Sequence, residues 1–155
     1  MKKEQTASGE KRLSIVAALQ EIASLLRLNA VDPFRARAYA KAAEAIAQFS
    51  GDLEALIDRK ELTTIKGIGQ SIAGVIEELF LTGRSPLLDK LRAEFPAGAV
   101  ALSQIPGLTA KRIRTLNSEL GITSTSELKE ALESGKVREL TGFGAKTESA
   151  LLEQL

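Results

Sequence analysis

Apolar residues recur along most of the chain at the spacing of one helix face. Near the N-terminus, Ile15, Leu19, Ile22 and Leu26 lie three or four positions apart, which predicts an amphipathic helix over residues 10–28. The same pattern predicts helices at 34–49, 52–57, 70–82, 86–95, 110–119 and 125–134. No stretch shows the alternation of a half-buried strand. The pattern therefore predicts an all-α protein.

Residues that favour helix starts precede several of these segments. Asp32 is a predicted N-cap, with Pro33 at the first helical position. Thr109 is a second predicted N-cap, and Ser124 with Glu127 has the spacing of a capping box. Gly51, Gly83 and Gly121 follow three of the helices, as is common at helix C-termini.

The sequence Phe95-Pro96-Ala97-Gly98 is the strongest break between helical segments. We expect a disordered polar tail at residues 1–12, one helical unit at 13–95 and a second at 96–155. The expected core of the first unit is Leu13, Ile22, Leu26, Ile46, Ile72, Ile76 and Leu79, and that of the second is Ile105, Ile113, Leu116, Leu128 and Leu132.

The composition limits the chemistry that the chain can perform. The absence of cysteine excludes disulfides and thiolate metal sites, and the absence of histidine removes the usual general base. No run approaches the roughly 18 apolar residues of a membrane helix, and the polar N-terminus is unlike a signal peptide. We therefore expect a cytoplasmic protein. Because the net charge is only +1, any surface that attracts nucleic acid must be local.

A pair of glycines at the start of a predicted helix occurs in TTIKGIGQSIAG, residues 63–74. Its frame recurs twice: aligned on the first glycine, the copies read IKGIGQSIA, IPGLTAKRI and LTGFGAKTE, and these glycines are Gly67, Gly107 and Gly142. An apolar residue lies two positions before and one position after each of them. Three copies in frame indicate a shared role, although they could also be plain connections between helices. No strand or third glycine completes a dinucleotide-binding fingerprint.

The chemistry of such a turn suits a phosphate group. Glycine adopts the backbone angles of a tight turn readily, and the apolar residue after it would fill the gap between the helices. The first N–H groups of the next helix are left unpaired at the positive end of its dipole. A second glycine, Gly69 or Gly144, would let a phosphate come close, whereas Thr109 replaces it in the second copy. The residue two positions later is Ser71, Lys111 or Lys146.

These turns resemble the helix-hairpin-helix motif, which binds the DNA backbone without sequence preference. The resemblance covers most of residues 13–155. The segments DPFRARAYAKAAEAI, LTTIKGIGQSIAGVIEELFLTG, LSQIPGLTAKRIRTL and GITSTSELKEALESGKVRELTGFGAK follow the order seen at the start of bacterial family X DNA polymerases. There, a lyase-type domain with one hairpin precedes a DNA-binding subdomain with more. The resemblance implies an all-α pair of units that grips DNA at gaps, nicks or ends.

The resemblance also implies particular contacts. The DNA-binding residues would be Gly67, Gly69, Ser71, Gly107, Lys111, Gly142, Gly144 and Lys146, with Arg35, Arg37, Tyr39 and Lys41 on the 34–49 helix. The carbonyls of Thr63, Ile65, Ile68, Ser103, Ile105 and Leu108 would hold K⁺ or Na⁺ beside a phosphate; no other cofactor is implied. From the residues alone, the three cations of the 34–49 helix could equally form a solvated face. Tyr39 suits the core better than a DNA end.

The chain departs from the family at its catalytic positions. The lyase lysine of the family lies six residues past the second glycine of the first hairpin, where this chain has Val75. Ser71 replaces a second lysine, and Lys66 is the nearest substitute nucleophile. The polymerase aspartates and the histidines of a phosphoesterase are absent, so we expect no enzymatic activity. In the third copy, Glu148 stands where the motif has a small residue, which would shift the helix or place negative charge near a phosphate.

Two other functions remain open at this stage. The chain could be a protein-interaction scaffold that keeps the helical fold and has lost DNA binding, as its near-neutral charge allows. It could also be a lyase that uses an unexpected lysine. As a DNA-binding module it would be a nucleoid-associated monomer, with a polymerase palm or another repair protein as a possible partner.

Overall fold

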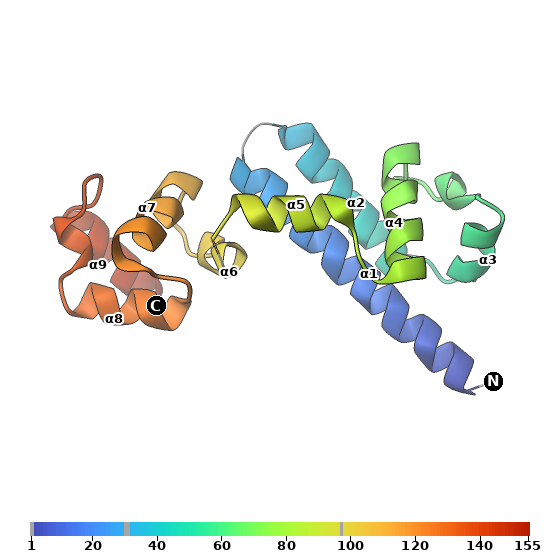
Figure 1. Cartoon of the computed structure of the whole chain (residues 1–155), viewed down its shortest axis with the longest axis horizontal. Coiled ribbons are helices and arrows are strands. Elements are labelled where there is room, and N and C mark those ends of the chain that lie inside the picture. Colours follow the sequence, from blue (N-terminus) through green and yellow to red (C-terminus); the bar gives the residue numbers. More distant parts are fainter. Residues whose placement is uncertain (1, 30–31, 97) are drawn as a thin grey trace. The chain divides into compact units, whose positions relative to one another are not determined.

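The computed structural model describes residues 2–29, 32–96 and 98–155, and these ranges contain helices, turns and loops but no strand (Figure 1). The chain divides into two compact units, Met1–Leu91 and Arg92–Leu155, close to the break that the sequence indicates. The all-α prediction is confirmed. None of the described helices is both long enough and apolar enough to span a bilayer.

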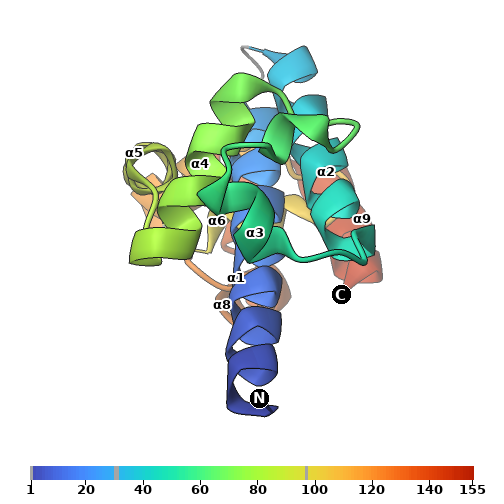
Figure 2. The same cartoon turned by 90° about the vertical axis from the view of Figure 1, so that its right-hand side faces the viewer.

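The first unit is built around its N-terminal helix. Its elements are α1 (Lys2–Asn29), α2 (Pro33–Gln48), α3 (Leu53–Asp58), the 3₁₀ helix η1 (Leu62–Thr64), α4 (Gln70–Thr82) and most of α5 (Pro86–Glu94). Helix α1 contacts both α2 and α4, which lie on either side of it in Figure 2. The predicted apolar stripe of α1, from Ile15 to Leu26, is buried against them.

Two expectations for α1 are wrong. Leu13 is 71% exposed, whereas every other predicted core residue of this unit is buried. Leu13 lies two residues before Ile15, which places it on the far side of a helix with 3.6 residues per turn. The helix also begins at Lys2, so residues 2–12 are not a disordered tail. This segment has no proline and is rich in good helix formers, so the helix extends backwards from the packed part.

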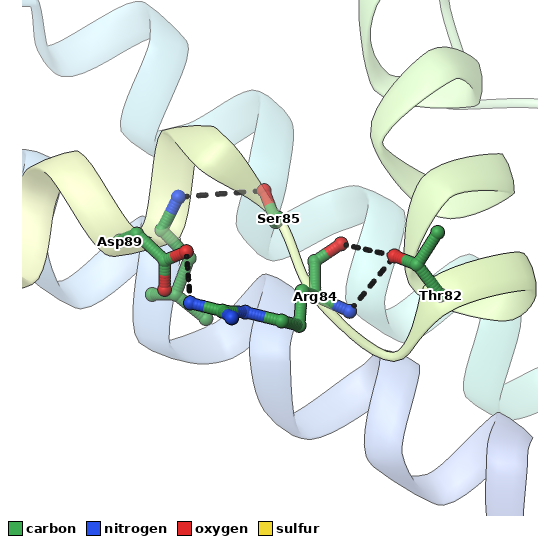
Figure 3. A network of polar contacts seen from close by, with 5 residues as sticks. Thr82, Arg84, Ser85 and Asp89 are labelled. Atoms are coloured by element: carbon green, nitrogen blue, oxygen red, sulfur yellow. Dashed lines mark hydrogen bonds and ion pairs between the residues drawn. The ribbon is translucent and has the colours of Figure 1, made fainter.

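A compact polar network fixes the turn from α4 into α5 (Figure 3). The Thr82 hydroxyl accepts a hydrogen bond from the Arg84 backbone N–H at 3.1 Å. Buried Ser85 caps α5 by accepting from the Leu88 N–H at 3.3 Å, and Arg84 pairs with Asp89 at 3.2 Å. The turn therefore satisfies its own polar groups and fixes the start of α5.

The second unit contains α6 (Ala99–Ser103), α7 (Ala110–Leu120), α8 (Thr125–Glu133), the 3₁₀ helix η2 (Val137–Glu139) and α9 (Ala145–Gln154). All five predicted core residues are buried. Gly98 is the N-cap of α6 with φ +78°, and a Cβ there would lie 1.7 Å from the Thr123 carbonyl oxygen. Only glycine therefore fits where the chain enters this core.

The predicted caps are largely confirmed. Asp32 accepts from the Arg35 N–H at 3.0 Å, and Thr109 accepts from the Arg112 N–H at 3.3 Å. The capping box forms only in part. Ser124 accepts from the Glu127 N–H, but the Glu127 carboxylate accepts from the Thr123 hydroxyl at 3.1 Å.

Candidate nucleic-acid interface

The three glycine turns share one backbone geometry. Gly67, Gly107 and Gly142 have φ of +98°, +94° and +87°, in the left-handed region that favours glycine. In each turn, the backbone N–H of the residue after the glycine donates to the carbonyl of the residue two positions before the glycine. The N···O distance is 3.1 Å in all three turns. The pairs are Ile68 with Ile65, Leu108 with Ile105, and Phe143 with Leu140. The predicted threefold repeat is therefore present in the fold.

The residue after each of these glycines fills the space between the two helices, as expected. Ile68 is 4% exposed, Leu108 is 7% exposed and Phe143 is 9% exposed. Each turn is thus fixed by one apolar side chain and one backbone hydrogen bond, which together set the direction of the helix that follows.

The second glycine of the first and third turns is not required by the fold. Gly69 has φ −87° and Gly144 has φ −147°, both extended values that any residue adopts. A Cβ at either position would meet no atom within 4 Å. Thr109 occupies the same place in the second turn with φ −85°. Neither backbone strain nor packing explains why two copies carry glycine here.

The helices after the turns differ in how their first N–H groups are satisfied. Gly69 and Gly144 are the N-cap residues of α4 and α9 and offer no side-chain hydrogen bond, whereas the Thr109 side chain caps α7. The first turns of α4 and α9 therefore keep more unpaired donors. The predicted contact residues beside them, Ser71, Lys111 and Lys146, are all exposed.

The basic cluster at the start of α7 consists of Lys111, Arg112 and Arg114, and these residues have different surroundings. Arg112 donates through Nη1 to the Gly107 carbonyl at 2.7 Å, and its guanidinium lies 5.6 Å from the centre of the Phe143 ring. Arg114 lies over the Phe95 ring at 4.7 Å. Two of the three cations are thus held by aromatic rings. No sequence pattern indicated that Arg112 ties the second turn to the third.

Glu148 is the clearest departure from the sequence-based expectation. The residue is 3% exposed, and its carboxylate accepts from the Arg138 backbone N–H at 2.9 Å and from Arg138 Nη2 at 2.8 Å. These hydrogen bonds hold the pKa of the Glu148 carboxyl below its ordinary value, although burial acts in the opposite direction. Its charge is paired inside the unit and ties η2 to α9.

Helix α2 presents cations and one aromatic ring. Arg35, Arg37 and Lys41 are exposed, and the Arg37 guanidinium lies 4.8 Å from the centre of the Phe34 ring. Phe34 is 76% exposed, a feature that the sequence reading missed. Tyr39, by contrast, is 2% exposed and belongs to the core. Burial raises the pKa of Tyr39, and the nearby Arg35 opposes this shift.

The residues at the expected lyase and cation-binding positions can be located in the structure. Val75 is half-buried on α4, a helix without any lysine, and Lys66 is exposed in the first turn. No group of three or more acidic, histidine or cysteine side chains among the described residues could hold a metal ion. Of the carbonyls expected to bind K⁺ or Na⁺, those of Ile65 and Ile105 each accept one backbone hydrogen bond. A carbonyl oxygen has a second lone pair, so this site stays a prediction.

Comparison with known proteins agrees with this architecture. Residues 11–85 match the family described as "Helix-hairpin-helix domain", and residues 99–155 match the "SAM-like Helix-hairpin-helix tandem". The chain is therefore a two-part helix-hairpin-helix protein.

The sequence also aligns with one longer relative. It is 38% identical over 141 residues to the DNA polymerase/3'-5' exonuclease PolX of Bacillus subtilis. The alignment includes 91% of this chain and 24% of the relative. The chain is therefore similar to the N-terminal region of a family X polymerase, and it spans about a quarter of that relative's length.

The Glu148–Arg138 pair predicts a specific acid sensitivity. Because the folded-state pKa of Glu148 is lowered, its stabilising effect is present above the pKa of the unfolded chain and is lost as pH falls through the folded value. Glu148→Gln should therefore lower the melting temperature at pH 7, and the difference from wild type should shrink below about pH 4. Thermal unfolding followed by circular dichroism measures this. A difference that stays constant from pH 7 to pH 3 would contradict the assignment.

Proposed function

We propose that this chain binds the DNA backbone without sequence preference, mainly through the first turns of α4 and α9. The observation that supports this most is the glycine at positions 69 and 144, which neither the backbone angles nor the packing requires. Open space beside uncapped N–H groups at a helix start suits a phosphate oxygen. The second hairpin would contribute less, because Thr109 already satisfies one N–H of α7 and adds bulk.

The small net charge of +1 is compatible with this proposal. Backbone N–H groups and a few lysines act within a few ångströms of a phosphate, and they need no overall positive field. Lys146 is exposed at the second position of α9 and would add one direct phosphate contact. If each of the two engaged turns meets about two phosphates, about four would be neutralised.

Exposed Phe34 supports a preference for gapped, nicked or broken DNA. A flat ring outside the core can stack on a base that has lost its neighbour, and an intact duplex offers no such base. Arg37 lies against this ring, and Arg35 and Lys41 are exposed on the same helix, where phosphates near a DNA end could meet them. Buried Tyr39 would support this helix from within and would not contact DNA directly.

The alignment with a polymerase suggests with which partners, and where in the cell, this chain would bind DNA. The module would place DNA for a polymerase palm or another repair protein and would lie with the nucleoid in the cytoplasm. K⁺ or Na⁺ at the turn carbonyls would strengthen the phosphate contacts without taking part in a reaction. A protein-interaction scaffold is the rival function. A gel shift at low salt with gapped and intact duplex separates the two, since a scaffold would retard neither.

Binding should depend strongly on salt and on the third turn. The plot of log K against log salt should have a slope of roughly −4 on duplex DNA. Gly144→Val should weaken binding while helix content is kept, since its side chain would fill the space left for a phosphate. Lys146→Ala should weaken binding equally on different sequences and make the slope shallower by about 1. Fluorescence anisotropy across a salt series measures all three.

Lys129→Ala is the matched control for these variants. Lys129 is an exposed lysine on α8, which follows none of the three repeated glycine turns, so its loss should change neither the affinity nor the slope. If Lys129→Ala weakens binding as much as Lys146→Ala, the attraction is diffuse. The glycine turns would then be ordinary connections between helices.

The chain should not act as a 5′-deoxyribose phosphate lyase. Val75 has no amine to form a Schiff base, and exposed Lys66 lacks the enclosed pocket that activates a nucleophilic lysine. Incubation with an abasic 5′-deoxyribose phosphate end and borohydride should therefore trap no covalent adduct above background. An adduct that disappears in Lys66→Ala would show that the chain is an enzyme.

A further inference from the structure

Lys60 has an unusual backbone conformation for a residue with a side chain. It follows the last turn of α3 with φ +57°, and it is the single non-glycine residue with positive φ in the part of the chain that the structure describes. A side chain in this region crowds the following carbonyl, so the conformation is costly for lysine. Helices that end in this way most often carry glycine at this position.

The third hairpin shows the same helix ending with glycine. The N–H of Lys60 donates to Ile57 and that of Glu61 donates to Leu56, at 3.1 and 2.8 Å. In the third hairpin the equivalent donors are Gly135, to Leu132, and Lys136, to Ala131, at 3.2 and 3.1 Å. Gly135 has φ +77°, and a 3₁₀ helix and a glycine turn follow in both copies. The two positions are therefore structurally equivalent.

No local interaction explains the lysine. Its side chain is exposed and makes no hydrogen bond, ion pair or ring contact with any described residue. A positive charge favours the end of a helix, but α3 has only 6 residues, and Arg59 at its C-cap already provides such a charge. The fold alone would be served better by glycine, as in the third copy.

The first hairpin also lacks the cation that the other two carry after the turn. Ser71 stands where the second and third copies have Lys111 and Lys146, and α4 contains no lysine or arginine. A positive charge for this hairpin must therefore come from residues before Gly67, and Lys60 and Lys66 are both exposed there. Lysine has a long, flexible stem, so its ammonium group can reach a phosphate several ångströms from its own backbone.

We propose that Lys60 is a phosphate contact of the first hairpin and replaces the lysine missing at position 71. This inference rests on the proposed DNA-binding function and adds a residue to that interface. A strained lysine is retained where glycine would suit the fold, because its charge holds the DNA backbone.

Two substitutions separate the charge from the backbone strain. Lys60→Gly removes both, so it should raise the melting temperature by about 2–4 °C. It should also weaken binding to gapped duplex about threefold to tenfold and make the salt slope shallower by about 0.9. Lys60→Gln removes only the charge, so it should weaken binding equally without raising the melting temperature. Gly135→Lys places a side chain at the equivalent positive-φ position of the third copy, so it should lower the melting temperature.

The remaining outcomes identify which idea fails. If wild type binds DNA and Lys60→Gly leaves both affinity and salt slope unchanged, Lys60 is no phosphate contact, although the proposed function stands. If Lys60→Gly lowers the melting temperature, the lysine is kept for the fold and the inference is overturned. If wild type retards neither gapped nor intact duplex, the proposed function itself fails, and this inference fails with it.

Discussion

The left-handed glycine turn, closed by a single backbone hydrogen bond, is the constraint on which the proposed interface depends. It occurs three times with φ between +87° and +98° and with the same 3.1 Å hydrogen bond. Because one buried apolar residue fixes each turn, the next helix starts at the surface with its N-terminus exposed to solvent. A non-glycine residue at Gly67, Gly107 or Gly142 would cost about 1–2 kcal/mol, and this is enough to explain glycine at these three positions.

The three hairpins share this backbone geometry but differ in their caps, ion pairs and cations, which the fold does not require to be alike. The second helix start is capped by Thr109, whereas the first and third are uncapped. The third copy pairs Glu148 with Arg138 internally, and Arg112 links the second turn to Phe143 of the third. The first copy instead carries a strained lysine before its turn. We infer that the hairpins contribute unequally to binding although their backbones are alike.

The sequence was sufficient to predict the local features of this protein. Helical periodicity located the packed faces, cap residues such as Asp32 and Thr109 behaved as expected, and the glycine frame revealed the repeat. These features depend on residues only a few positions apart. The main error is Leu13, which is apolar but lies two positions before Ile15 and therefore on the opposite side of the helix.

The features that the sequence did not predict depend on tertiary structure or on backbone angles. Arg138 and Glu148 are ten residues apart, and Arg112 and Phe143 lie on different hairpins, so the packing of the whole unit brings each pair together. The positive φ of Lys60 is known only from the backbone of the structure, because a lysine in the sequence does not predict a left-handed turn. The exposure of Phe34 likewise depends on how α2 packs, and no sequence pattern indicated it.

The most direct test of this account is an amide NMR titration of the labelled chain with a short gapped duplex. The account predicts the largest shifts at the first N–H groups of α4 and α9, residues 70–72 and 145–147. Smaller shifts should occur at residues 110–112, where Thr109 caps α7, and none on α8. Shifts centred on α8, or equal shifts at all three helix starts, would contradict the claim that the uncapped glycine turns hold the DNA.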